Sequence, residues 1–125
     1  MAKITIVDLE VMYCVGVTDE ERANPQRLLL TVDMTFDFTS AAVSDRIERT
    51  IDYYAVSQML LKYGEGRSWK LLERLVTKVA DEILKGFGFR LLTGGTHAIL
   101  KYGLPGNWLT FDAFAGDTEG CEARL

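Results

Sequence analysis

Apolar and polar positions alternate with a period of two near both ends of this chain and recur at helical spacing in its middle. The clearest alternation runs from Leu28 to Phe38, where every second residue is apolar and threonine or aspartate fills most positions between. This pattern predicts a long strand with one buried face. Lys3–Val17 is rich in isoleucine and valine and predicts a second long strand, with a bulge near Asp8 where the alternation shifts.

Helical spacing predicts three helices in the centre of the chain. The longest covers Trp69–Phe87, where apolar residues recur every three or four positions. A shorter helix is predicted for Tyr53–Tyr63, and a very short one for Ala41–Ser44, with Thr39 and Ser40 as candidate N-caps.

Two further strands are predicted near the end of the sequence, His97–Tyr102 and Trp108–Ala115, on either side of the turn GLPGN. The segments Thr18–Gln26, Tyr63–Arg67 and Thr93–Thr96 carry loop and turn residues. The order strand, strand, helices, strand, strand predicts an α+β fold of two layers, with a four-stranded antiparallel sheet and helices on one face. Residues 1–115 would form a single domain, and residues 116–125 a polar tail.

The predicted sheet has two open edges, and an exposed edge invites pairing with another chain. The second strand also presents threonine and aspartate on its other face, which suits a wet interior. We therefore expect a homo-oligomer in which sheets join edge to edge into a ring.

Composition excludes several classes of protein. The chain has 125 residues, 48% of them apolar, and a net charge of −4, which fits one globular domain and argues against a nucleic-acid surface. It has no apolar run long enough to cross a membrane. Cys14 and Cys121 are too far apart in the sequence to suggest a disulfide framework, so a cytoplasmic location is expected. The single histidine, His97, argues against a zinc site, and no phosphate or dinucleotide motif is present, so we expect no metal and no cofactor.

One acid stands out on the longest predicted helix. At about 100° per residue, Glu73 projects between Ala80 and Leu84, inside the apolar arc. A carboxylate there needs a partner that offsets its loss of hydration. A ligand with N–H donors is one candidate. An internal arginine, or a path to water from the edge of the arc, is the other.

Three segments together resemble the dihydroneopterin aldolase family: VGVTDEER (Val15–Arg22), IDYY (Ile51–Tyr54) and LLERL (Leu71–Leu75). The resemblance covers about Lys3–Ala115. It implies the tunnelling fold, built into a homo-oligomer, a tetramer or an octamer, with active sites between subunits. It implies a folate-pathway enzyme that splits 7,8-dihydroneopterin into 6-hydroxymethyl-7,8-dihydropterin and glycolaldehyde, without metal or cofactor.

The resemblance also implies how the pterin is held. Glu73 would accept hydrogen bonds from the 2-amino group and a ring N–H through its two carboxylate oxygens. Backbone groups near Leu72 and Asp52 would complete the contact with that edge of the ring.

The implied catalytic groups are an acid, a tyrosine and a lysine. Glu21 would lie near the trihydroxypropyl side chain. Tyr53, or Tyr54 by spacing alone, would lie over the reacting centre from a neighbouring subunit and protonate C1′ with a water. Lys101, acting through a water, would remove the proton of the 2′-hydroxyl.

At the lysine the sequence departs from the family, which usually reads Lys-Pro at the end of the third strand. Matching Pro105 to that proline places Leu104 at the lysine position. Matching Lys101 keeps the last strand in register without a gap and places Tyr102 at the proline, and we prefer this match.

Two other functions stay open. An epimerase of dihydroneopterin triphosphate would use the same groups and more positive charge, which Arg22, Arg27, Arg67 and Lys70 could supply. A non-catalytic pterin- or purine-binding oligomer would follow if Lys101 is misassigned.

Overall fold

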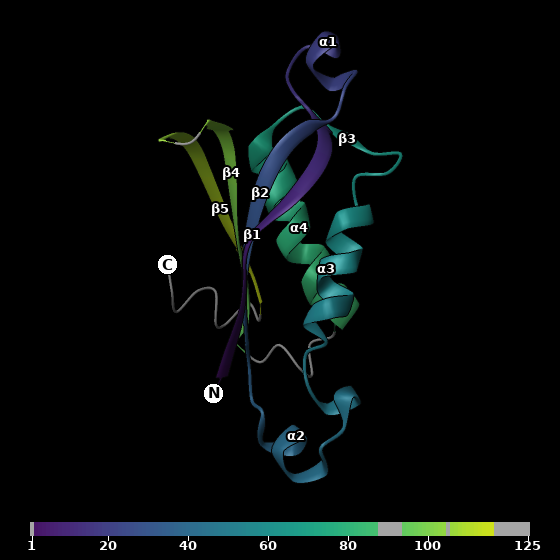
Figure 1. Cartoon of the computed structure of the whole chain (residues 1–125), viewed down its shortest axis with the longest axis vertical. Coiled ribbons are helices and arrows are strands. Elements are labelled where there is room, and N and C mark those ends of the chain that lie inside the picture. The colour runs from purple at the N-terminus through teal and green to yellow at the C-terminus, as the bar shows by residue number, and fades with distance from the viewer. Residues whose placement is uncertain (1, 88–93, 105, 117–125) are drawn as a thin grey trace.

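A computed structural model describes residues 2–87, 94–104 and 106–116 of the chain. One sheet is covered on one face by helices, so the fold has two layers (Figure 1). The elements in chain order are β1 (Ala2–Val15), α1 (Asp19–Arg22), β2 (Gln26–Phe36), α2 (Thr39–Ser44), η1 (Ile47–Arg49), α3 (Tyr53–Lys62), β3 (Ser68–Trp69), α4 (Leu72–Phe87), β4 (Gly95–Leu104) and β5 (Asn107–Ala115).

The sheet contains five strands in the order β3-β1-β2-β4-β5. The four long strands are antiparallel, as predicted, and the α+β class is confirmed. The fifth strand, β3, was not predicted. It pairs in parallel with β1 through only two residues, Ser68 and Trp69, and two residues are too few to show a period. Trp69 therefore belongs to the sheet rather than to the following helix.

The register of β1 against β2 shifts between Ile6 and Leu9, which confirms the predicted bulge near Asp8. Asp8 has a backbone φ of 51°, a left-handed conformation that aspartate tolerates better than most residues. Its backbone N–H donates to the Thr31 hydroxyl of β2 at 3.0 Å. The bulge is thus held by a side chain on the sheet face that carries no helices.

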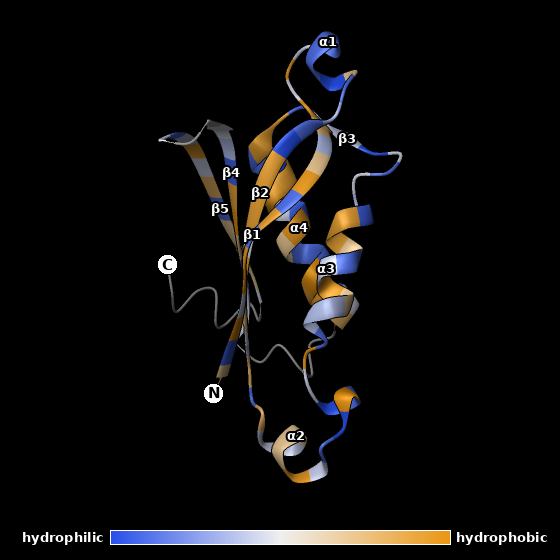
Figure 2. Cartoon of the chain, viewed as in Figure 1, coloured by the Kyte–Doolittle hydropathy of each residue, from blue (hydrophilic) through white to orange (hydrophobic). Residues whose placement is uncertain are grey.

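The alternation in β2 sorts its side chains onto two faces. Every second residue from Leu28 to Phe36 is buried against the helices, with at most 4% of its surface exposed. Thr31, Asp33 and Thr35 lie half-buried on the other face. Helix α4 supplies most of the opposing layer, and the hydropathy colouring shows apolar residues along the strands and α4 but a hydrophilic α1 (Figure 2).

An aromatic cluster fixes the connection between α3 and α4. The rings of Tyr13, Tyr63 and Trp69 lie 5.5 to 6.3 Å apart, centroid to centroid. Tyr13 donates its hydroxyl hydrogen to the Leu60 carbonyl at 2.5 Å, and burial raises the pKa of Tyr13. The Arg67 guanidinium lies 4.7 Å from the centre of the Tyr63 ring. Because β3 is tied to β1 here, α4 begins at a defined place beside the sheet.

Replacing Gly64 with alanine should destabilise this cluster. A Cβ atom at Gly64 would lie 2.5 Å from the Tyr13 ring and 3.2 Å from the Met12 carbonyl oxygen. We expect the Gly64→Ala variant to lose about 1–3 kcal/mol of unfolding free energy in urea titration, a typical cost of overpacking. Gly86→Ala is the matched control. Apart from its chain neighbours and the backbone of its own helix, no atom of the described residues lies within 4 Å of its added Cβ, and helix propensity should raise stability by about 0.5–1 kcal/mol. Equal unfolding midpoints for the parent and Gly64→Ala would contradict the tight packing.

Two local predictions need correction. The segment predicted as a loop, Thr18–Gln26, contains the short helix α1, because Thr18 and Glu21 form a capping box. Helix α2 begins earlier than predicted, at Thr39, and the N-cap residue Phe38 makes no side-chain capping bond. The predicted polar tail and the turn residue Thr93 fall outside the described residues, apart from Gly116.

Candidate functional site

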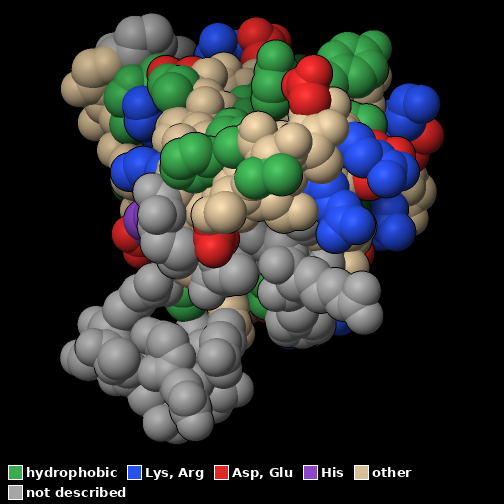
Figure 3. Space-filling view, turned by 90° about the horizontal axis from the view of Figure 1, so that it is seen from below, with side chains coloured by type: hydrophobic (Ala, Val, Ile, Leu, Met, Phe, Trp, Pro, Cys, Tyr) green, Lys and Arg blue, Asp and Glu red, His purple; other side chains and the backbone are tan. Residues whose placement is uncertain are grey.

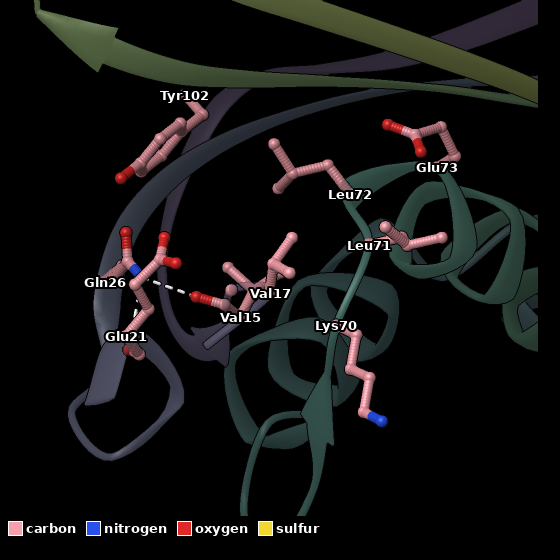
Figure 4. Close-up of a pocket in the computed structure, with 10 residues that line it drawn as sticks. Val15, Val17, Glu21, Gln26, Lys70, Leu71, Leu72, Glu73 and Tyr102 are labelled. Carbon is pink, nitrogen blue, oxygen red and sulfur yellow. Dashed lines mark hydrogen bonds between the residues drawn. The ribbon is translucent and has the colours of Figure 1, made fainter. Parts of the chain in front are cut away.

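A hollow of about 160 Å³ lies at the end of the molecule that carries α1. It is formed by the connection from β1 through α1 to β2, by the start of α4, and by the far end of β4 (Figure 4). We call it the α1 pocket, and its lining residues are Val15, Gly16, Val17, Glu21, Gln26, Lys70, Leu71, Leu72, Glu73 and Tyr102. An apolar floor with two carboxylates, one lysine, one amide and one phenol is suited to a small, partly polar ligand.

Glu73 lies in the first turn of α4, and its side chain is exposed at the α1 pocket. The predicted position inside a buried arc was wrong. The core covers α4 only from Leu75 onward, so a residue in the first turn projects beyond the core. Among the described residues the Glu73 carboxylate has no hydrogen bond or ion pair, so the alternative of an internal arginine is not found there. Its exposed side chain agrees with the other alternative, a path to water. The carboxylate is available to a ligand.

Glu21 is held in place by the capping box of α1. The Thr18 hydroxyl accepts from the Glu21 backbone N–H at 3.1 Å. The Glu21 carboxylate in turn accepts from the Thr18 backbone N–H at 3.2 Å. Arg22 closes the turn, because one guanidinium nitrogen donates to the carbonyls of Gly16 and Val17, each at 2.8 Å. These contacts orient one oxygen of a carboxylate that lines the pocket.

Close packing in the connection between β1 and β2 explains two more lining residues. A Cβ atom on Gly16 would lie 2.3 Å from the Glu21 Cβ, so only glycine allows α1 to fold back this far. The Gln26 amide nitrogen donates to the Val15 carbonyl at 2.5 Å, which orients the amide beside Glu21. Gln26 was missed from the sequence, because a polar residue at the start of a strand carries no distinctive signal.

Lys101 and Tyr102 point to opposite faces of β4, as successive residues of a strand do. Tyr102 lies on the helix-covered face and lines the α1 pocket. Lys101 pairs across the sheet with Leu29, and its Nζ atom lies 3.3 Å from an Asp8 carboxylate oxygen. The structure of a single chain therefore does not bring Lys101 to Glu73 and Glu21. Tyr102 was not predicted as a site residue, although the alternation Ala98, Leu100, Tyr102 already indicated its face.

Asp52 and Tyr53 lie where α3 begins, near α2 and away from the α1 pocket (Figure 1). Asp52 caps α3, since its carboxylate accepts from the Ala55 backbone N–H at 3.0 Å. Tyr53 and Tyr54 leave 61% and 68% of their surface exposed. These residues do not join Glu73 within one chain, so any shared site would need a second chain.

Two further findings concern the described residues only. They contain no group of three or more histidine, cysteine, aspartate or glutamate side chains arranged to hold a metal ion. None of their helices has the length and apolar character needed to cross a membrane.

The two-layer fold and the carboxylate-lined pocket at its end define a small α+β protein with one sheet, helices on one face and a site for a small polar ligand. Within that class, the profile of the FolB family, dihydroneopterin aldolase, matches residues 4–93. The chain belongs to this family. The match ends before β4, so it includes Glu21, Asp52, Tyr53 and Glu73 but neither Lys101 nor Tyr102.

Individual relatives carry two different enzyme names. Dihydroneopterin aldolase of Haemophilus influenzae is 33% identical over 81 residues, which cover 65% of this chain and 69% of the relative. Dihydroneopterin triphosphate 2'-epimerase of Pseudomonas aeruginosa is 25% identical over 85 residues, covering 68% and 69%. The crystal structure of Escherichia coli dihydroneopterin aldolase in complex with neopterin shares the fold, with a TM-score of 0.78, 23% identity, and coverage of 93% and 100%.

Proposed function

We propose that this protein is a dihydroneopterin aldolase that cleaves 7,8-dihydroneopterin into 6-hydroxymethyl-7,8-dihydropterin and glycolaldehyde. The observation that carries the proposal is the Glu73 carboxylate, which lines a partly apolar pocket and has no partner among the described residues. Membership of the family supports it. The proposed location is the cytoplasm. Cys14 is a free cysteine, and a reducing compartment keeps thiols in that state.

The α1 pocket offers the pterin a charged edge and an apolar surface. The two oxygens of Glu73 would accept from the 2-amino group and the adjacent ring N–H, a bidentate arrangement. Leu71, Leu72 and Val17 supply apolar surface for the flat ring. The backbone at Leu72 would complete the contact, together with backbone near Asp52 of a neighbouring chain.

The chemistry is a retro-aldol cleavage driven by proton transfer. A base removes the proton of the 2′-hydroxyl, the C1′–C2′ bond breaks, and its electron pair moves to C1′, where the C6=N5 imine of the substrate delocalises it. Protonation of C1′ completes the reaction. Glu21, which lines the α1 pocket, would contact the trihydroxypropyl chain, and Tyr53 of a neighbouring chain, with a water, would protonate C1′. The role of Lys101 in the first step stays a prediction.

Turnover of 7,8-dihydroneopterin by the purified protein tests this function. We expect glycolaldehyde and 6-hydroxymethyl-7,8-dihydropterin in equal amounts, without added metal. Stoichiometric binding of neopterin with no turnover would instead identify a non-catalytic pterin-binding protein.

An epimerase is the second candidate, because Lys70 lines the α1 pocket and could contact a phosphate group. Dihydroneopterin triphosphate offered in a parallel assay would decide between the two. An aldolase releases glycolaldehyde faster from the unphosphorylated substrate. An epimerase inverts C2′ of the triphosphate without releasing an aldehyde.

The proposed site needs more than one chain. The hollow of about 160 Å³ is smaller than a usual ligand pocket, roughly 300 Å³ or more, so a neighbour would complete it. On the end of the molecule that carries α2, hydrophobic side chains gather on the surface (Figure 3). Exposed apolar residues near this end are Phe38, Val43, Ile47, Tyr53 and Tyr54. The edges of β5 and of most of β1 have no partner strand in the described sheet.

We therefore expect a ring-based homo-oligomer, a tetramer or a pair of tetramers. Light scattering at micromolar concentration should give four or eight times the 14.0 kDa chain mass. A monomer under these conditions would refute the assembly and, with it, a site shared between subunits.

A further inference from the structure

We propose that Tyr102, rather than Lys101, is the side chain of β4 that moves the proton of the substrate's 2′-hydroxyl. The inference rests on the proposed aldolase function and assigns one step of it to a residue. It follows from which face of β4 each side chain occupies, from what Lys101 already contacts, and from the backbone that follows Tyr102.

The first argument is the alternation along β4. Ala98 and Leu100 are fully buried against the helical layer. Tyr102 is the next residue on that face, half-buried at the edge of the core, and it lines the α1 pocket. Lys101 lies between them on the other face, which carries no helices. No side-chain rotation moves a residue from one face of a paired strand to the other.

The second argument is that Lys101 already has a partner. Its ammonium group lies 3.3 Å from the carboxylate of Asp8, at the bulge of β1. The same carboxylate oxygen accepts from the Thr31 hydroxyl at 3.3 Å. Lys101 therefore belongs to a polar cluster that ties β1, β2 and β4 together on the helix-free face. Its position there is accounted for without a catalytic role.

The third argument comes from Gly103. Its backbone φ is +130°, and a Cβ atom there would lie 2.6 Å from the Asn107 carbonyl oxygen. Proline, whose φ is fixed near −65°, cannot occupy this position. The family usually reads Lys-Pro where the third long strand ends. Here β4 ends at Leu104, so no Lys-Pro pair stands at its end, and the left-handed backbone of Gly103 means that a proline could not directly follow Tyr102 either.

The fourth argument is the position of the phenol within the α1 pocket. In Figure 4 the Tyr102 hydroxyl points toward the side chains of Gln26 and Glu21, and Glu73 lies on the opposite side of Leu72. A pterin held by Glu73 at its amino edge would extend its trihydroxypropyl chain from the other end of the ring, toward Tyr102 and Glu21. The phenol is thus placed at the hydroxyl groups that react.

These positions define a balanced proton path. The Tyr102 oxygen takes the 2′-hydroxyl proton while its own proton passes to the Glu21 carboxylate. The C1′–C2′ bond breaks, C2′ becomes the aldehyde carbon of glycolaldehyde, and the electron pair goes to C1′ and the C6=N5 imine. A water beside the neighbour's Tyr53 protonates C1′, and Glu21 releases its proton to solvent. One proton leaves the substrate and one returns, and no redox change occurs.

Single-turnover rates of three variants test the assignment. Tyr102→Phe removes only the hydroxyl, and we expect the cleavage rate to fall at least about a hundredfold, the usual contribution of a positioned acid or base. Neopterin affinity by calorimetry should stay within about threefold, because Glu73 holds the ring. Tyr63→Phe is the matched control, a tyrosine outside the pocket, and should cleave at the parental rate. Lys101→Ala tests the competing assignment. We expect it to lower the thermal unfolding midpoint, because the contact with Asp8 is lost, and to cleave at close to the parental rate.

The outcomes separate the two proposals. Cleavage by Tyr102→Phe at the parental rate would overturn the role of Tyr102. A loss confined to Lys101→Ala would return the role to the lysine. A parental protein that binds neopterin but releases no glycolaldehyde would refute the aldolase function itself, and the role of Tyr102 in it.

Discussion

Glu73→Gln should weaken pterin binding by about thirtyfold to several hundredfold, because the loss of a charge-assisted bidentate contact costs on the order of 2–4 kcal/mol. An amide offers one acceptor and one donor where the pterin edge presents two donors. One of its N–H groups would then face a ligand N–H. Calorimetric titration with neopterin measures the effect directly.

The position of Glu73 separates an effect on binding from an effect on stability. Its carboxylate is exposed in the first turn of α4 and has no partner among the described residues, so the substitution should leave stability unchanged. Glu82→Gln is the same substitution in the same helix but outside the α1 pocket, and it should bind neopterin like the parent. If Glu73→Gln binds neopterin as tightly as Glu82→Gln does, Glu73 is not the anchor.

The sequence predicted the long elements well, because their periods are strong. The alternation placed the buried face of β2 correctly from Leu28 to Phe36, and the break near Asp8 located the bulge of β1. The alternation was wrong at Phe38, which lies beyond the end of β2 and is exposed. Elements that depend on one or two tertiary contacts were not predicted. The strand β3 exists because Trp69 packs on Tyr13, a tertiary contact that no local pattern encodes.

The site was harder to predict, because its residues come from three separated parts of the chain. Glu21 was found by resemblance and Glu73 first by its place in the helical pattern, and both line one pocket in the structure. Helical periodicity alone placed Glu73 on the buried face, because a period describes direction around a helix but not where the core ends along it. At β4, a match without gaps favoured Lys101. The strand's own alternation, which decides which side chain meets the pocket, indicated Tyr102.

Mixing two inactive variants should restore activity if the sites lie between subunits. Glu73→Gln lacks the anchor, and Tyr53→Phe should lose about a hundredfold in rate if its hydroxyl helps to protonate C1′. When the two chains are produced together and assemble at random, about a quarter of the sites in a closed ring join an intact Glu73 to an intact Tyr53 of the neighbour. We therefore expect about a quarter of the parental rate per site, far above either variant alone.

This result depends on geometry that one chain cannot provide, because Tyr53 begins α3 at the end of the molecule away from the α1 pocket. A chain carrying both substitutions, mixed equally with the parent, is the control. It should leave about a quarter of sites intact if the residues act across subunits, but about half if they act within one chain. Complementation that stays at the level of the single variants would show that Tyr53 does not act across the interface. Repeating the mixture with Tyr54→Phe would then decide which of the two exposed tyrosines does.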